Sequence, residues 1–374
     1  MTGIHQFVPV LLRNDAVGEH TLAVRDLLRR AGFESRIYSE TPVAATRDEA
    51  RPFREYEADA RPGDVLVYQF ATRSGIADWL LGRPEPLVVN YHSVTPPDSF
   101  ASWNNGSARL QVACLDELAR LAPRAVLGIA VSEFDGRELR AAGCAATTVI
   151  PVVTVPGDPV PADEGFAARL RGPWPAVAGA GDAAPGALWL SVGRLAPNKA
   201  HQDAVAALFL ERMTGDPDAR LVIVGSVSER NYAGALRRYV SWLGLDRAVR
   251  FLTGLTAGEL SACYQAADVL VMLSDHEGFG VPLVEAMHHG LPVVAYAAGA
   301  VPEVLGEAGL LLADKSPGHV ATEVHRVLGD PELRARLASA VPGQLARLDV
   351  ASAAEALVGA LRGVAGARPV VGTP

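Results

Sequence analysis

Two carboxylates, Glu277 and Glu285, flank a turn that joins an apolar strand to a helix. The turn holds Gly278, Phe279 and Gly280, and glycine tolerates the backbone angles of a tight turn. Free amides and the dipole at a helix start attract anions. Carboxylate oxygens accept several hydrogen bonds, which suits sugar hydroxyls. The pattern favours a site for an anionic, hydroxyl-bearing ligand, although a lone Glu near a helix start also simply favours the dipole.

Two cations, Arg194 and Lys199, follow another apolar strand, and Gly193 provides the turn between strand and loop. Guanidinium and ammonium groups beside free backbone amides suit a diphosphate, because charge-assisted hydrogen bonds are strong. Isolated Arg and Lys side chains are more often solvated surface groups. The position of both cations just after a strand favours the phosphate site.

Together the two motifs resemble the donor site of retaining glycosyltransferase family 4, whose signature has two glutamates separated by seven residues around a Gly-Phe-Gly-x-Pro core. The resemblance covers the chain except its linker and tail. It implies an α/β GT-B fold, in which two Rossmann-like, doubly wound domains have parallel sheets that face each other across a deep cleft. It also implies that Glu285 binds the nucleotide ribose, that Glu277 binds donor sugar hydroxyls, and that Arg194 and Lys199 bind the pyrophosphate.

The first half of the chain offers two further candidates, Gly18 and His92. Gly18 is expected before a helix that begins near Glu19, where its amide could face a phosphate, although such a glycine is as often a plain turn. His92 ends an apolar strand, and a lone histidine is more often structural than catalytic. The resemblance favours donor contacts for both. A Gly-x-Gly-x-x-Gly fingerprint is absent here, which argues against a nicotinamide enzyme.

The remaining candidates lie in two loops. Gly299 opens a helix and resembles a second phosphate-facing turn, which places it with Gly193, Gly278, Phe279 and Gly280 among the expected donor-binding residues. Trp103 and Asn104 lie in a loop that is rich in aromatic and amide groups. We expect this loop to touch the acceptor, and a plain surface turn is the alternative.

Strands and helical patterns alternate along the chain, which predicts parallel, doubly wound sheets. Ligands of such sheets bind above the carboxyl ends of the strands, where the candidates above are expected. In the first half the predicted strands are Ile4–Val8, Glu34–Tyr38, Asp64–Phe70, Leu87–Tyr91, Ala125–Val131 and Thr147–Val152. In the second half they are Leu188–Val192, Arg220–Val224, Val249–Leu252, Val269–Leu273 and Pro292–Tyr296.

A chain of 374 residues is too long for one typical core, so two domains are expected. Residues 1–160 are predicted to form an acceptor domain and residues 187–350 a nucleotide-sugar donor domain. Residues 161–186, which are rich in Pro, Gly and Ala, predict a linker. The helix at 351–366 is expected either to return to the first domain, as in the GT-B fold, or to stay on the second. Residues 367–374 are expected to form a frayed tail.

Composition excludes several classes of protein. No apolar run reaches the length of a membrane span, and the first residues lack the layout of a signal peptide. Cys114, Cys144 and Cys263 have no metal spacing and cannot all pair, so a reducing cytoplasm is the expected location. The net charge of −8 argues against a nucleic-acid partner. It argues less against a membrane surface, because a local basic patch would suffice.

The resemblance implies transfer of a hexosyl unit from a UDP- or GDP-linked sugar to a hydroxyl of a soluble sugar or small molecule, with retention of configuration. The expected catalytic residues are His92, Arg194, Lys199 and Glu277. No cofactor or metal is expected, because the two cations can neutralise the leaving group. Three alternatives remain: a non-catalytic nucleotide-sugar-binding protein, a nucleotide-sugar epimerase, and a transferase with a lipid acceptor at the membrane surface. The sequence leaves the oligomeric state open.

Overall fold

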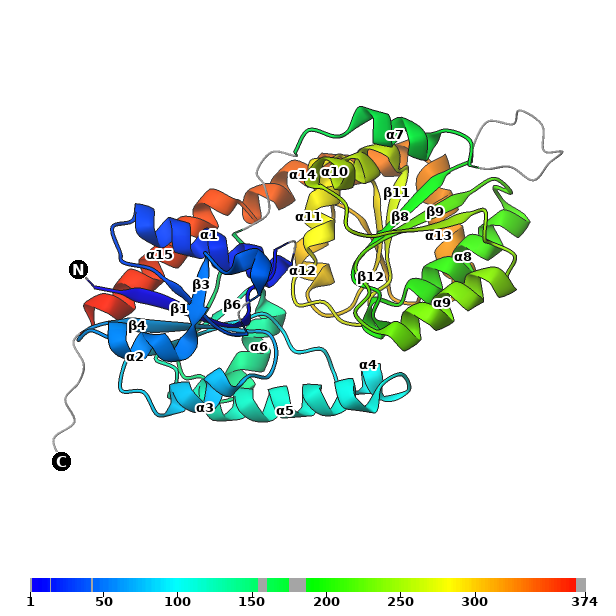
Figure 1. Ribbon diagram of the computed structural model, residues 1–374. Coiled ribbons are helices and arrows are strands. Elements are labelled where there is room, and N and C mark those ends of the chain that lie inside the picture. The colour runs from blue at the N-terminus through cyan, green and yellow to red at the C-terminus, as the bar shows by residue number, and fades with distance from the viewer. Residues whose placement is uncertain (1, 14, 42, 154–159, 175–185, 368–374) are drawn as a thin grey trace. The chain divides into compact units, whose positions relative to one another are not determined.

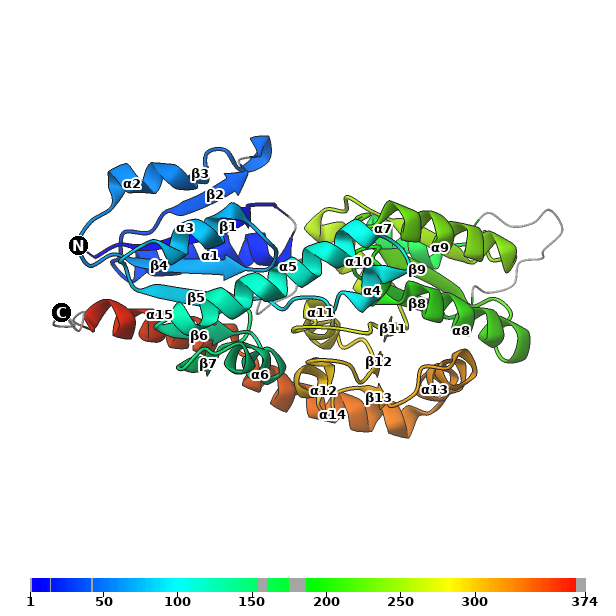
Figure 2. The same ribbon diagram turned by 90° about the horizontal axis from the view of Figure 1, so that it is seen from below.

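The computed structural model describes residues 2–13, 15–41, 43–153, 160–174 and 186–367 (Figures 1 and 2). The described residues divide into two compact units. The first unit comprises those within 1–97, 106–155 and 348–374, and the second those within 98–105 and 156–347. Each unit is built on one sheet in which all neighbouring strands are parallel.

The sheet of the first unit has the strand order β3-β2-β1-β4-β5-β6-β7. Its strands are β1 (Ile4–Val10), β2 (Ile37–Thr41), β3 (Ala50–Pro52), β4 (Val65–Phe70), β5 (Leu87–Tyr91), β6 (Leu127–Ala130) and β7 (Thr147–Val149). The helices are α1 (Ala16–Arg30), α2 (Tyr56–Asp59), α3 (Gly75–Leu81), α5 (Asn105–Leu121), α6 (Glu133–Ala141) and α15 (Val350–Gly366). Short 3-10 turns are η1 (Ala44–Thr46), η2 (Phe53–Glu55) and η3 (Ala122–Arg124).

Both faces of this sheet are buried, which explains its nearly continuous apolar strands. Side chains alternate between the faces along a strand. In β4, Val65 and Val67 pack with α1 and α15, whereas Leu66 and Tyr68 pack on the opposite side against α3 and α5. The alternating sides of one strand therefore supply two cores, as a doubly wound sheet requires.

The sheet of the second unit has the strand order β10-β9-β8-β11-β12-β13. Its strands are β8 (Leu188–Val192), β9 (Arg220–Val224), β10 (Val249–Leu252), β11 (Val269–Met272), β12 (Val293–Tyr296) and β13 (Leu310–Leu312). The longer helices are α8 (His201–Thr214), α9 (Arg230–Trp242), α10 (Ala257–Ala266), α13 (Pro317–Gly329) and α14 (Pro331–Arg347). The shorter ones are α4 (Asp98–Ala101), η4 (Pro197–Lys199), α7 (Glu164–Arg171), α11 (Val281–His288) and α12 (Val301–Leu305).

The last helix returns to the first unit. Leu357 and Leu361 of α15 are buried in the same cluster as Ile4 of β1 and Val24 of α1, and α1 and α15 lie side by side (Figure 1). The prediction of two doubly wound parallel sheets is confirmed, and of the two alternatives for the last helix the structure shows the return to the first unit. Among the described residues, no helix combines the length and apolar character needed to cross a membrane.

Several details differ from the sequence-based expectations, and β2, for example, spans Ile37–Thr41 rather than the predicted Glu34–Tyr38. The first helix begins at Ala16 rather than near Glu19, because Asp15 caps it by accepting a hydrogen bond from the Gly18 amide. The short strands β3 and β13 were not predicted, since three residues carry little periodicity. Residues 98–105, expected in the first domain, group with the second unit. Within the expected linker, α7 packs on α10, in agreement with the short helix that the sequence indicates near Phe166–Leu170. Residues 175–185 of the linker and 368–374 of the expected tail lie outside the described part of the chain.

Candidate functional site

The two sequence motifs of the second unit meet at one edge of its sheet. Strands β8 and β11 are neighbours and run parallel, so their carboxyl ends lie side by side (Figure 1). The loops that follow them touch, because the Asp275 amide donates to the Asn198 carbonyl at 2.8 Å. Sheet order therefore brings together two motifs that are far apart in sequence.

Lys199 and Glu277 form an ion pair at this meeting point. Lys199 Nζ lies 2.6 Å from Glu277 Oε1, and the two side chains are only 17% and 8% exposed. A charge-assisted bond with so little water around it is short and strong. The residue that is predicted to bind the pyrophosphate, Lys199, therefore contacts the residue that is predicted to bind the sugar, Glu277.

His201, which the sequence analysis did not name, stabilises the loop that carries Arg194 and Lys199 by hydrogen bonds to the loop backbone. His201 Nε2 lies 3.2 Å from the Gly193 carbonyl and 3.3 Å from the Arg194 carbonyl, so it must donate to them. Its Nδ1 then accepts from the Ser191 hydroxyl at 3.0 Å. Burial lowers the pKa of His201 to about 4, so the ring is neutral at physiological pH.

This arrangement corrects one expectation. Both cations were expected to lie beside free amides, but the Gly193 and Leu195 amides donate to the Val224 and Ser226 carbonyls at 2.9 and 2.8 Å. The Lys199 amide likewise donates within the loop, to the Ala196 carbonyl at 3.0 Å. An anion at this loop would therefore be held mainly by the side chains of Arg194, which is exposed, and Lys199.

A second lysine supports the loop that carries Glu277. Lys315 Nζ lies 2.5 Å from an Asp275 carboxylate oxygen and 2.8 Å from one of Asp203, and it donates to the Leu273 carbonyl at 3.2 Å. These contacts tie the end of β11 to α8 and to the segment after β13. The only sequence signal was that Lys315 and Lys199 are the two lysines of the chain.

Gly299 is required by the close approach of the Glu277 backbone. Its φ is +57°, and a Cβ built there would lie 2.3 Å from the Glu277 carbonyl oxygen. The next amide, that of Ala300, donates to the same oxygen at 2.9 Å. The turn predicted to face a phosphate thus also fixes the backbone of Glu277.

Gly299→Ala is expected to destabilise the protein more than Gly290→Ala and to weaken ligand binding at Glu277. Both glycines have similar φ, +57° and +62°, so each variant bears the left-handed penalty of about 1–2 kcal/mol. Only Gly299→Ala also meets backbone atoms, since nothing lies within 4 Å of a Cβ at Gly290. Urea unfolding and diphosphate titration of the two variants measure the difference. Equal losses would contradict the steric role of Gly299.

Glu285 is oriented by a tyrosine from the preceding helix. Tyr264 Oη donates to Glu285 Oε2 at 2.5 Å, and the ring of Tyr264 stacks on His289 with 5.3 Å between centroids. Burial raises the pKa of Glu285 above its ordinary value, and the tyrosine hydrogen bond opposes that rise. Tyr264 was not predicted, because its place beside Glu285 depends on how α10 packs against α11.

The turn before α11 contains two glycines, and one of them, Gly280, has the left-handed backbone conformation that favours glycine in a tight turn. Gly280 has a φ of +93° and is the N-cap of α11, with Pro282 in the first helical turn. Phe279 is buried at 6% exposure, so its ring packs within the protein. The sequence thus predicted the strand, the left-handed turn and the helix of this segment.

The two candidates of the first unit lie in the first turn of α1 and directly after β5. Gly18 is inside the first turn of α1, its amide serves the Asp15 cap at 3.3 Å, and a Cβ there would lie 1.8 Å from the Leu12 carbonyl oxygen. Close packing therefore explains this glycine, and its donor contact stays a prediction. His92 directly follows β5, and its Nε2 lies 2.7 Å from Gln69 Oε1. Burial, and then the nearby His20, lower the pKa of His92 well below its ordinary value.

The acceptor candidates Trp103 and Asn104 make contacts within the second unit. The Trp103 ring packs edge-on against Tyr232, with 5.2 Å between centroids. Asn104 Nδ2 donates to Glu229 Oε2 at 3.0 Å, and the Trp103 carbonyl accepts from Asn231 Nδ2 at 3.2 Å. These bonds attach residues 98–105 to α9, and an acceptor contact of either residue stays a prediction.

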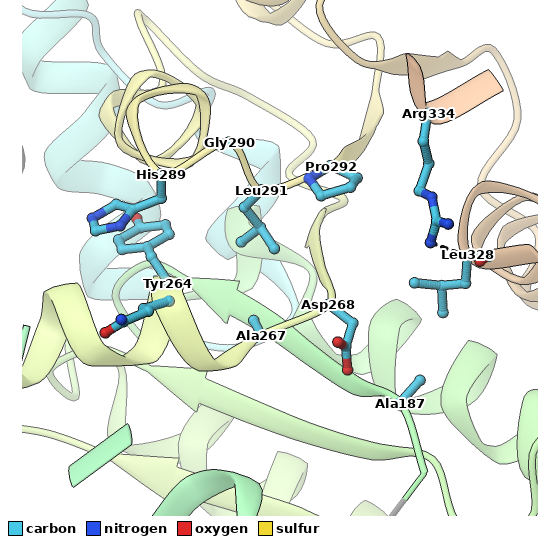
Figure 3. Close-up of a pocket in the computed structure, with 11 residues that line it drawn as sticks. Ala187, Tyr264, Ala267, Asp268, His289, Gly290, Leu291, Pro292, Leu328 and Arg334 are labelled. Atoms are coloured by element: carbon cyan, nitrogen blue, oxygen red, sulfur yellow. Dashed lines mark hydrogen bonds between the residues drawn. The ribbon is translucent and has the colours of Figure 1, made fainter. Parts of the chain in front are cut away.

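A pocket of about 490 Å³ lies at the opposite edge of the same sheet (Figure 3). Ala187, Asp268 and Pro292 directly precede β8, β11 and β12, so the pocket lies at the amino ends of these strands. Tyr264 and His289 form one wall. Because ligands of parallel sheets bind at the carboxyl ends, we assign the site to Lys199 and Glu277 rather than to this pocket.

Comparison with known proteins gives three kinds of match. Residues 183–343 match a family model described as "Glycosyl transferases group 1". The D-inositol 3-phosphate glycosyltransferase of Actinosynnema mirum is 31% identical over 303 residues, which cover 77% of this chain and 70% of that protein. Proteins of the same name from Corynebacterium glutamicum and Streptomyces bingchenggensis are 38% and 35% identical. Those two alignments cover 39% and 49% of this chain, but the chain spans only 36% and 43% of the two relatives.

Solved structures share the fold. Anabaena HepE, crystallised with UDP and glucose, has a TM-score of 0.71 and 20% identity, over 97% of this chain and 100% of that chain. Sucrose-phosphate synthase from Thermosynechococcus elongatus has a TM-score of 0.75 and 20% identity, over 97% and 99% of the two chains. At such identities the likeness supports the architecture alone.

Proposed function

The chain belongs to the group 1 glycosyl transferases, and we propose that it transfers a hexosyl unit from a nucleoside diphosphate sugar to an acceptor hydroxyl with retention of configuration. The family resemblance and the GT-B fold expected from the sequence are confirmed. The donor, the acceptor and the stereochemical course belong to the proposal.

One observation carries the proposal: the Lys199–Glu277 ion pair at the carboxyl ends of β8 and β11. A cation suits the diphosphate of the donor and a carboxylate suits the hydroxyls of its sugar. Because Lys199 and Glu277 lie 2.6 Å apart, a donor that binds to both would have the bond between its sugar and its diphosphate next to this ion pair. Arg194 adds a second cation on the same loop, and Glu285 would bind the ribose.

In the proposed reaction the bond from the anomeric carbon to the leaving phosphate oxygen breaks, and a bond to the acceptor oxygen forms on the same face. The acceptor proton passes to an oxygen of the departing diphosphate. Arg194 and Lys199 stabilise the charge that develops on that group. Glu277 binds and orients the sugar, since its ion pair with Lys199 favours a positioning role over nucleophilic attack.

We propose that this chemistry needs no metal ion or other cofactor. Two cationic side chains on one loop can supply the charge stabilisation that a divalent cation gives other transferases. Unchanged activity in excess chelator would support this assignment, whereas activity that a divalent cation restores would overturn it.

A UDP-linked hexose is the preferred donor, with GDP-linked hexoses as the alternative. HepE, which shares the fold, was crystallised with UDP-glucose. The curated relatives are named for transfer to D-inositol 3-phosphate. Within the expected class of soluble sugars and small molecules, a phosphorylated cyclitol is therefore the first acceptor to test. The preferred cytoplasmic location rests on three cysteines, all buried as free thiols in the structure.

The proposal is tested by thermal shift of the purified chain with UDP, GDP, ADP, TDP and NAD, followed by product analysis with the matching sugar nucleotides. A ligand at about 100 times its Kd should stabilise the folded state by roughly 2.7 kcal/mol. We expect one uridine or guanosine diphosphate to raise the Tm and Glu285→Gln to reduce that rise. Glu307→Gln, which changes an exposed carboxylate, is the matched control.

The products separate the remaining alternatives. A glycosylated acceptor with the donor's anomeric configuration supports the proposal. An epimerised donor without acceptor would indicate an epimerase, and binding without turnover a nucleotide-sugar-binding protein. Transfer only to lipid in vesicles would indicate a membrane-surface enzyme. A Tm rise with NAD alone would overturn the donor site.

A further inference from the structure

His92 is hydrogen-bonded to a network of buried amide side chains, and one end of this network fixes which atom of each amide donates and which accepts. Gln6, Gln69 and Asn90 are at most 1% exposed and come from β1, β4 and β5. These three strands are neighbours in the sheet, which lines the side chains up beneath His92. Amide oxygens and nitrogens are assigned from their hydrogen-bond partners, so an unambiguous starting partner decides the whole chain.

The starting partner is a backbone carbonyl, which can only accept. The side-chain nitrogen of Gln6 lies 3.0 Å from the Thr21 carbonyl oxygen, so it must be the amide donor. The oxygen of Gln6 then faces Gln69 and accepts from Gln69 Nε2 at 2.7 Å. Gln69 must therefore turn its Oε1 to its other neighbours.

Gln69 Oε1 has two such neighbours, Asn90 Nδ2 at 2.9 Å and His92 Nε2 at 2.7 Å. An amide oxygen can only accept, so His92 carries its proton on Nε2. A neutral imidazole has one proton, which leaves Nδ1 as an acceptor. Among the residues that the structure describes, the His92 side chain makes its hydrogen bond through Nε2, and Nδ1 makes none.

Asn90 also points its amide nitrogen at Gln69 Oε1, although this orientation leaves its own amide oxygen without a partner in the described part of the chain. Its Nδ2 also contacts His20 Nε2 at 2.9 Å, while its buried Oδ1 has no hydrogen-bond partner within the described chain. Reversing this amide would set its oxygen against Gln69 Oε1. Val153 N lies 3.5 Å from His20 Nδ1, which is too long to compete with the Asn90 contact. The two N–H groups of the Asn90 amide therefore donate to Gln69 Oε1 and His20 Nε2, and Gln69 Oε1 remains the acceptor for His92 Nε2.

We infer that Gln69 is a positioning residue that fixes His92 in its Nε2–H tautomer and thereby presents Nδ1 as an acceptor for a ligand hydroxyl at the carboxyl end of β5. The tautomer follows from this structure alone, whereas the role of Nδ1 rests on the proposed function. A hydroxyl is the matching ligand, because Nδ1 of this tautomer cannot donate to a phosphate or carbonyl oxygen. Gln6 acts one step further away, by preventing the Gln69 amide from reversing.

The tautomer is tested by nitrogen-15 NMR of the full chain with labelled histidine, near neutral pH. The chain has nine histidines, and His92→Gln identifies the His92 signals by their loss. We expect a protonated Nε2 and an unprotonated Nδ1 at His92. In Gln69→Leu, and more weakly in Gln6→Leu, both nitrogens should move toward the averaged shifts of a tautomer mixture. The signals of His201, in the other unit, should stay unchanged and report the fold.

Kinetics test the role of Nδ1. With an active donor, Gln69→Leu should lower kcat/KM by about tenfold, the typical effect of one neutral hydrogen bond. In a series of monodeoxy donors, the one that lacks the contacted hydroxyl should show no difference between wild type and variant.

The outcomes separate the two claims. A wild-type His92 with its proton on Nδ1, or unchanged shifts in Gln69→Leu, overturns the role of Gln69. The expected shifts together with unchanged kcat/KM for every donor overturn the acceptor role of Nδ1. The expected shifts without any transfer leave the tautomer standing and reject the proposed function.

Discussion

Lys199→Met is expected to lower turnover by on the order of 10²-fold or more, as loss of a group that stabilises transition-state charge does elsewhere. The variant removes the cation that lies 2.6 Å from Glu277 and that would face the leaving diphosphate. It should also abolish the Tm rise given by the diphosphate. Steady-state kinetics with the active donor and thermal shift with its diphosphate measure the two effects.

Loss of folding must be separated from loss of catalysis, because Glu277 is only 8% exposed and would lose its ion partner. An unpaired buried charge destabilises a protein by about 3–5 kcal/mol. The double variant Lys199→Met/Glu277→Gln should recover most of the Tm but none of the turnover. Arg247→Met, a change on the exposed surface, is the control for loss of a positive charge. Wild-type turnover in a folded Lys199→Met protein would remove Lys199 from the mechanism.

Acid is expected to weaken both units through two buried histidines before most carboxylates are protonated. Burial lowers the pKa of His20 and of His201 from 6.5 to about 4. Above about pH 6.5 each histidine is neutral in the folded and unfolded chains. Between about pH 6.5 and 4 the unfolded chain binds a proton that the folded chain excludes, so stability falls as the pH falls. The full loss is on the order of 3 kcal/mol for each histidine.

Peptide-resolved hydrogen exchange across this pH range can follow the two units separately, which matters because a two-unit chain need not unfold in one step. His20→Gln should flatten the pH dependence in peptides of β4 and β5, and His201→Gln should do so in peptides of β8. The exposed His319→Gln is the control. Burial raises the pKa of Glu117, Glu138 and Glu285, which opposes the trend in part of the window. The comparison of variants, rather than the total slope, therefore decides the prediction. Identical slopes in all variants would show that these histidines are not neutral in the folded protein.

The sequence alone determined the parallel sheets and the local form of the main motif. Apolar strands such as Leu87–Tyr91 were predicted with their observed ends, because both faces of a doubly wound sheet demand apolar residues. The turn at Gly280 and the helix that it opens were also predicted, since glycine in a left-handed conformation and an early proline are local signals. Lys199 and Glu277 could be named as candidates for the same reason.

Only the tertiary structure decided which side chains meet. Lys199 contacts Glu277 because β11 pairs with β8 in the sheet, and strand order is not written in the periodicity of either strand. Lys315 and Tyr264 reach the site through the packing of distant elements, and neither stands in a recognisable motif.

The same reason explains the errors and the omissions. Residues 98–105 lie between two strands of the first sheet in sequence, β5 and β6, but they pack on α9, because the Trp103 ring contacts Tyr232 there. The tautomer of His92 depends on amides from three strands and on the carbonyl of Thr21 in a helix. Helix and strand propensity are set by neighbours along the chain, whereas hydrogen-bond partners of buried groups are set by neighbours in space. The first kind of information is present in a single sequence, and the second exists only after the sheets have assembled.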